Sequence, residues 1–150
     1  MADIKTAQTT WVSGMQFKAT TGTGHSIVMD SAAEHGGEDA GPRPVELVLA
    51  ALGGCTAMDV ISILRKKRQP VAGLEVHVRG VQAPDFPHKF TDIHVEYVVH
   101  GNGVAPQAVA RAIELSEQSY CSVSATLRGV AKITTSYRIE PVAEEQLQPA

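Results

Sequence analysis

Two cysteines are the residues of this chain best suited to chemistry. Cys55 and Cys121 lie 66 residues apart and are the only two in 150 residues. The N-terminal stretch "MADIKTAQTT" has no basic region followed by an apolar segment, so we expect a cytoplasmic protein. In that reducing compartment two distant cysteines persist as thiols rather than as a structural disulfide. Persistent thiols can do redox work.

The surroundings of each cysteine leave two interpretations open. Cys55 follows Gly53 and Gly54 in the apolar run "ELVLAALGGCTAMDVISIL". A small residue in an apolar helix is commonly an inert buried thiol. Two consecutive glycines cost a helix about 2 kcal/mol against alanine, however, so another segment or a substrate must approach the backbone there. Cys121 follows Tyr120 at the start of a predicted short helix, where free N–H groups favour a thiolate, or it is simply buried.

Other kinds of chemistry have little support in the sequence. The six histidines show none of the usual ligand spacings to one another or to cysteine, so we predict no metal centre and no cofactor. The "GTG" at 22–24 has no helix after it, and no G-x-S-x-G elbow is present. The net charge is −3, and the only basic run is "RKKRQ". We therefore predict no nucleic-acid partner.

The segment that carries Cys55 is predicted to be a long buried helix. Val45 to Leu64 is long enough to span a membrane, but Glu46 and Asp59 interrupt it, and each charge in lipid costs about 3 kcal/mol. Pro44 suits the first turn, and Pro70 follows the basic end. Apolar residues occupy almost every face, so the helix needs cover all round. We infer no membrane partner and a homodimer whose second copy supplies that cover.

The remaining segments predict one α+β domain over 1–150. The 43% hydrophobic content supports a single core, placed at about 11–139 between flexible N-terminal and C-terminal tails. Long strands segregated from helices favour antiparallel sheets. The predicted elements are a hairpin of strands 10–21 and 25–31, a loop at 34–44, a hairpin of strands 73–83 and 90–101, helices at 107–120 and 121–129, and a last strand at 130–140.

Two motifs resemble a known family. "RPVELVLAALGGCTAMDVISIL" and "YCSVSATL" are similar to the two-cysteine signature of the OsmC/Ohr family, the osmotically inducible protein C and organic hydroperoxide resistance proteins. The acidic residue after "GGC" and the "YCSV" resemble its YhfA-like branch. The resemblance implies an OsmC-like fold with two long central helices packed in an intertwined homodimer. It also implies that Cys55 attacks an organic hydroperoxide, that Cys121 resolves the product as a disulfide, and that a dithiol such as a lipoyl group reduces it.

The chain departs from the family's peroxidases at the positions that activate the thiolate. Those enzymes carry a glutamate ten residues before the first cysteine, where this chain has Val45. Glu46 is one residue away, which on a helix is a rotation of about 100°. Lys18 and Arg43 are the candidates for the family's arginine. Asp59 lies one turn after the first cysteine, and a carboxylate there disfavours a thiolate unless it is neutralised.

Two functions therefore remain open. The first is a hydroperoxide reductase that uses both cysteines, with Glu46 as a candidate catalytic residue. Apolar walls would select organic hydroperoxides, and the candidates for them are Phe17, Leu49, Leu52 and Met58. The second is a non-catalytic protein that binds a small hydrophobic ligand or a thiol on the same dimeric scaffold. Glu46 at the Cys55 sulfur favours catalysis, whereas Asp59 against it without a cation favours binding.

Overall fold

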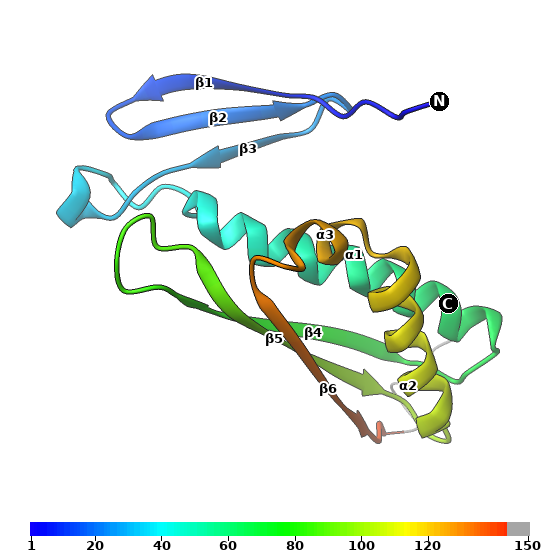
Figure 1. Cartoon of the computed structure of the whole chain (residues 1–150). Helices are drawn as coiled ribbons and strands as arrows, with labels where there is room; N and C mark the ends of the chain where they lie inside the picture. Colours follow the sequence, from blue (N-terminus) through cyan, green and yellow to red (C-terminus); the bar gives the residue numbers. More distant parts are fainter. Residues whose placement is uncertain (144–150) are drawn as a thin grey trace. The chain divides into compact units, whose positions relative to one another are not determined.

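The computed structural model describes residues 1–143, which form two compact units. The first unit is Met1–Val48, and the second begins at Leu49 (Figure 1). Helix α1 (Pro44–Lys66) starts in the first unit and continues through the second. The predicted N-terminal tail has no regular structure as far as residue 6, and the end of the predicted C-terminal tail, 144–150, lies outside the described residues.

The first unit is a three-stranded antiparallel sheet rather than the predicted two-stranded hairpin. Its strands are β1 (Ala7–Ser13), β2 (Gln16–Thr21) and β3 (Ser26–Met29), in that order. The predicted single strand over 10–21 was wrong because the chain reverses at Gly14, whose φ of 52° favours glycine. The indole N–H of Trp11 donates to the Gly14 carbonyl at 2.8 Å and holds this turn. The sheet also begins at Ala7, before the predicted core.

The predicted loop at 34–44 is organised by one buried carboxylate. A short 3-10 helix, η1 (Ala33–His35), overlaps its start. Asp30 is 2% exposed, and its carboxylate accepts the backbone N–H groups of Ser31, Glu38 and Ala40 at 2.8 to 3.0 Å. The bond from Ala40 contributes most to lowering the Asp30 pKa below its ordinary value of 3.8, against burial, which raises it.

Helix α1 matches the prediction in length, and within the described part of the second unit one of its faces is buried. Its buried residues are Leu52, Gly53, Thr56, Val60 and Leu64. An 18-residue window has a mean hydropathy of 2.0, enough by length and composition to span a membrane, and only 28% of it is buried. The described residues of the second unit therefore supply the expected cover on one face of the helix.

The second unit contains a mixed sheet rather than an antiparallel one. Strands β4 (Gly73–Gln82) and β5 (Phe90–His100) form the predicted hairpin. Strand β6 (Lys132–Glu140) pairs with β5 in parallel, so the expectation of purely antiparallel sheets was wrong. The reason is the helical crossover between the two strands, which returns the chain to the end where β5 began. Helices lie on one face of this sheet (Figure 1).

The crossover consists of three consecutive helical segments. These are α2 (Pro106–Leu115), the π-helical turn η2 (Ser116–Tyr120) and α3 (Ser122–Leu127). The predicted helix at 107–120 is therefore helical throughout, with a wider last turn. The buried residues of α2 pack with those of α1 and β5 into one core. This core includes Leu52, Val60, Leu64, Val95, Tyr97, Val109 and Ala112.

Candidate active site

The fold brings the two cysteines together from opposite halves of the second unit. Cys55 lies in the middle of α1, and Cys121 lies between η2 and α3. The Cys55 and Cys121 sulfurs and a carboxylate oxygen of Asp59 all lie within 4.8 Å of one another. Cys121 is 2% exposed, whereas Cys55 and Asp59 are partly exposed. Of the two thiols, Cys55 is therefore the one that a reagent from solvent can reach more easily.

Local backbone geometry places Cys121. After the wide η2 turn the residue adopts an extended conformation, with φ −72° and ψ 104°, and its N–H donates to the Ser116 carbonyl at 2.8 Å. It is then the N-cap of α3, where its sulfur accepts the Ser124 N–H at 3.3 Å. Burial raises the pKa of the Cys121 thiol to about 11, the Ser124 N–H lowers it, and the neighbouring Cys55 raises it.

A buried chain of hydroxyl groups supports the carboxylate. Thr56 Oγ1 lies 2.7 Å from Tyr97 Oη and 2.7 Å from Ser116 Oγ, and Ser116 donates to Asp59 Oδ2 at 2.8 Å. Each hydroxyl has one proton. Because Ser116 gives its proton to Asp59, it must accept from Thr56, and Thr56 must accept from Tyr97. Burial raises the Tyr97 pKa to about 12, which keeps the first donor of this chain protonated.

Asp59 also borders a cavity. The cavity has a volume of about 540 Å³ and is lined by Asp59, Ser62, Ile63, Lys66, Lys67, Leu115 and Tyr120. Its lining therefore combines the apolar residues Ile63 and Leu115 with residues of both charges. Asp59, which lies close to both sulfurs, is therefore also part of the wall of a space large enough for a small molecule.

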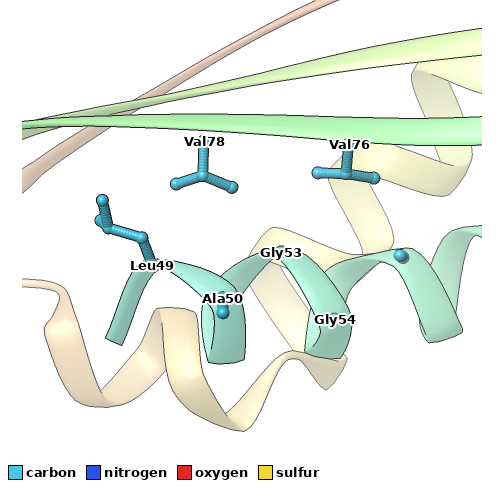
Figure 2. Close-up of a pocket in the computed structure, with 7 residues that line it drawn as sticks. Leu49, Ala50, Gly53, Gly54, Val76 and Val78 are labelled. Atoms are coloured by element: carbon cyan, nitrogen blue, oxygen red, sulfur yellow. The ribbon is translucent and has the colours of Figure 1, made fainter. Parts of the chain in front are cut away.

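Packing against the sheet explains one of the two glycines that precede Cys55. A Cβ added to Gly53 would lie 3.1 Å from the Val78 side chain of β4, so this glycine lets the helix approach the sheet closely. Figure 2 shows Gly53 facing Val76 and Val78 beside a second cavity, of about 390 Å³, which Leu49 also lines. A Cβ on Gly54 would meet nothing within 4 Å in the described part of the chain. Only the first glycine is therefore explained by packing.

The predicted apolar walls lie in different places. Leu52 is 1% exposed and is part of the core. Met58 is 72% exposed and borders another hollow, with Ile61 and Arg65. Leu49 faces the cavity of Figure 2, and Phe17 is exposed on β2. Within the second unit the three predicted leucine and methionine side chains do not line one common cavity.

Two of the three predicted activating residues, Glu46 and Arg43, have partners of their own in the first unit. Glu46 accepts the Arg43 backbone N–H at 2.8 Å, a reach-back contact that caps the start of α1. The Arg43 guanidinium binds Asp39 at 2.6 Å. Lys18 is exposed on β2, opposite Thr10 of β1. A catalytic role for Glu46 and substrate binding by Lys18 or Arg43 stay predictions.

Comparisons with known proteins place the chain in a family. A family model of OsmC-like proteins matches residues 36–136. Protein YhfA of Escherichia coli K12 is 41% identical over 133 residues, which cover 89% of this chain and 96% of YhfA. The chain belongs to the OsmC-like family, and the likeness to YhfA confirms the branch that its motifs resemble.

Solved structures agree with this assignment. A protein from Aquifex aeolicus VF5 superposes with a TM-score of 0.83 at 29% identity, covering 95% of this chain and all of that one. An organic hydroperoxide resistance protein OsmC from Legionella pneumophila superposes with a TM-score of 0.66 at 15% identity, covering 91% of this chain and 98% of that one. The latter likeness is one of fold.

Proposed function

We propose that this protein is a thiol-dependent peroxidase that reduces organic hydroperoxides through Cys55 and Cys121. The observation that carries the proposal is the pair of sulfurs within 4.8 Å, one partly exposed and one buried. A two-cysteine cycle needs a partly exposed thiol that attacks the peroxide first, and a buried thiol beside it that then forms the disulfide. Membership of a family that includes hydroperoxide resistance proteins supports the same chemistry.

The cycle assigns a different role to each sulfur. The Cys55 thiolate attacks one oxygen of the peroxide, the O–O bond breaks, and the alkoxide takes a proton and leaves as an alcohol. Cys55 is then a sulfenic acid. The Cys121 thiolate attacks its sulfur, a disulfide forms, and water leaves. A dithiol, of the lipoyl type in this proposal, reduces the disulfide by exchange and restores both thiols.

We also propose that the protein is a homodimer. One side of α1 is uncovered, with Met58 72% exposed, and the first unit exposes Trp11, Val12 and Phe17. Apolar surface on this scale usually marks an interface. A second copy of the chain is the proposed cover, and cavities near the sulfurs would then gain walls that one chain does not provide. We place the protein in the cytoplasm, where the thiols remain reduced between cycles.

One observation favours the alternative, a non-catalytic protein that binds a small hydrophobic ligand or a thiol. The Asp59 carboxylate lies within 4.8 Å of both sulfurs, and the partner that fixes it is the neutral Ser116 hydroxyl. A nearby negative charge disfavours a thiolate. In this alternative the cavity beside Asp59 holds the ligand and no peroxide is consumed.

The rate at which the protein consumes cumene hydroperoxide, with dihydrolipoamide as reductant, distinguishes the peroxidase from the binding protein. The native chain should consume peroxide continuously, and Cys55→Ser should consume none above the uncatalysed rate. Cys121→Ser should lose catalytic turnover, because its sulfenic acid cannot close the disulfide. Ser119→Ala, at an exposed position two residues before Cys121, is the matched control and should behave as the native chain. Equal rates for the native chain and Cys55→Ser would favour the binding protein.

A further inference from the structure

We propose that the reduced protein binds one zinc ion through Cys55, Asp59 and Cys121, with a fourth position open to the cavity beside Asp59. This inference is independent of peroxidase activity, because it needs only two reduced thiols and one carboxylate. It also differs from the expectation drawn from histidine spacing, since none of the three ligands is a histidine and they come from two distant segments.

The spacing of the three ligand atoms fits a tetrahedral centre. Zinc holds thiolate sulfur at about 2.3 Å and carboxylate oxygen at about 2.1 Å, so tetrahedral ligand atoms lie about 3.5 to 3.8 Å apart. The three atoms already lie within 4.8 Å of one another. Closing by about 1 Å is within the reach of side-chain torsions. Cys55 and Asp59 stand one turn apart on α1, which makes them natural chelating neighbours.

Each ligand except Cys55 already has a supporting contact of the kind that orients metal ligands. Ser116 donates to Asp59 Oδ2, and the second carboxylate oxygen, Oδ1, is the proposed ligand atom. The Ser124 N–H donates to the Cys121 sulfur and orients it. Thr56 and Tyr97 hold Ser116 in turn. Such outer contacts fix the rotamer of a ligand and are part of a working metal site.

The donor set selects zinc among the common divalent ions. Two thiolates and one carboxylate suit a borderline-soft ion that prefers four ligands, whereas Mg²⁺ and Ca²⁺ require oxygen ligands. Three protein ligands with an open fourth position is the arrangement of zinc sites that exchange water. The bound centre carries a net charge of −1, and Lys66 and Lys67 line the same cavity as Asp59.

Binding releases the two thiol protons and uses both sulfurs. A bound ion therefore leaves neither Cys55 free to attack a peroxide nor Cys121 free to form a disulfide. Zinc and peroxide should compete for the reduced protein, and oxidation to the disulfide should release the ion.

The test is a titration of the reduced, metal-free full chain with Co²⁺, which reports thiolate ligands directly. We expect a near-ultraviolet thiolate-to-cobalt band that saturates at one equivalent, visible bands typical of tetrahedral cobalt, and loss of both when one equivalent of Zn²⁺ is added. Cys55→Ser and Cys121→Ser should each weaken the band strongly. Asp59→Asn should lower the affinity at least about 10-fold, whereas Asp92→Asn, on an exposed position of β5, should leave it unchanged.

Two results would overturn the site. One is the absence of a thiolate-to-cobalt band in the fully reduced chain, and the other is equal cobalt affinity in the native chain and Asp59→Asn. Peroxide consumption measured in excess chelator is a separate readout. A chain that binds zinc but consumes no peroxide refutes the proposed function alone, and a chain that consumes peroxide but binds no zinc refutes this inference alone.

Discussion

Replacement of Thr56 by valine tests the buried hydroxyl chain, because valine keeps the shape of threonine and removes only its hydroxyl. Thr56 is 2% exposed, and its oxygen is the single link between Tyr97 and Ser116. In Thr56→Val the Tyr97 O–H has no acceptor, and Ser116 loses the donor that completes its geometry toward Asp59. Tyr97 is 1% exposed and Ser116 is fully buried, so water does not replace either bond readily.

The magnitude follows from those two unsatisfied groups. Leaving one buried hydroxyl without its partner costs about 1 to 3 kcal/mol. Two such groups cost about 2 to 6 kcal/mol, and the added buried methyl returns about 1 kcal/mol. We therefore expect Thr56→Val to lower the free energy of unfolding by about 1 to 5 kcal/mol. The double change Thr56→Val with Tyr97→Phe should be less destabilising than the sum of the single changes, because it removes both partners of one bond.

Equilibrium urea unfolding followed by far-ultraviolet circular dichroism measures these differences, at one fixed protein concentration because dimerisation shifts apparent stability. Thr126→Val is the matched control, since its hydroxyl binds a helix carbonyl at an exposed position, and it should change stability by less than about 0.5 kcal/mol. A Thr56→Val protein as stable as this control, or a double variant as unstable as the sum, would refute the directional chain.

Two further predictions concern the interface and the first unit. Met58 is 72% exposed, so Met58→Asp should convert the proposed dimer into a folded monomer in light scattering. Leu52 is part of the core, so Leu52→Asp should unfold the chain. A dimeric Met58→Asp would contradict this interface. The Asp30 carboxyl should titrate below 3.8 in carbon NMR, so its stabilisation is present at neutral pH and is lost only as pH falls through that lowered pKa. Asp30→Asn should destabilise the unit, and an Asp30 pKa above 3.8 would refute the carboxylate's structural role.

Local patterns were sufficient for the elements that bury one face. The alternation in 73–83 and 90–101 predicted β4 and β5, and the apolar run with its prolines predicted α1. The direction of β6 was not predictable in this way, because strand pairing depends on where the crossover delivers the chain and not on the strand's own residues. The turn at Gly14 was missed because β-prone residues continue on both sides of it.

In the candidate site, too, local patterns predicted the features that depend on neighbouring residues and missed those that depend on distant ones. The placement of Asp59 one turn after Cys55 followed from helical spacing alone. The hydroxyl chain did not, because Thr56 meets Tyr97 and Ser116 at sequence separations of 41 and 60 residues. Threonine and serine in helices carry no signal of such partners. The role of Glu46 in capping α1 was not predicted, because Arg43 stands where the capping-box pattern has serine or threonine, although a glutamate three residues later can still reach back to the backbone N–H.

The central claim is that Cys55 and Cys121 act as a reactive pair, and a single-turnover experiment tests it most directly. Reduced, chelator-treated protein is mixed with one equivalent of cumene hydroperoxide, and the products are mapped by peptide mass spectrometry. We predict one equivalent of cumyl alcohol and an intramolecular disulfide between Cys55 and Cys121, with sulfenic acid at Cys55 alone in Cys121→Ser. Unreacted thiols with peroxide intact, or alcohol formed equally by Cys55→Ser, would contradict the account.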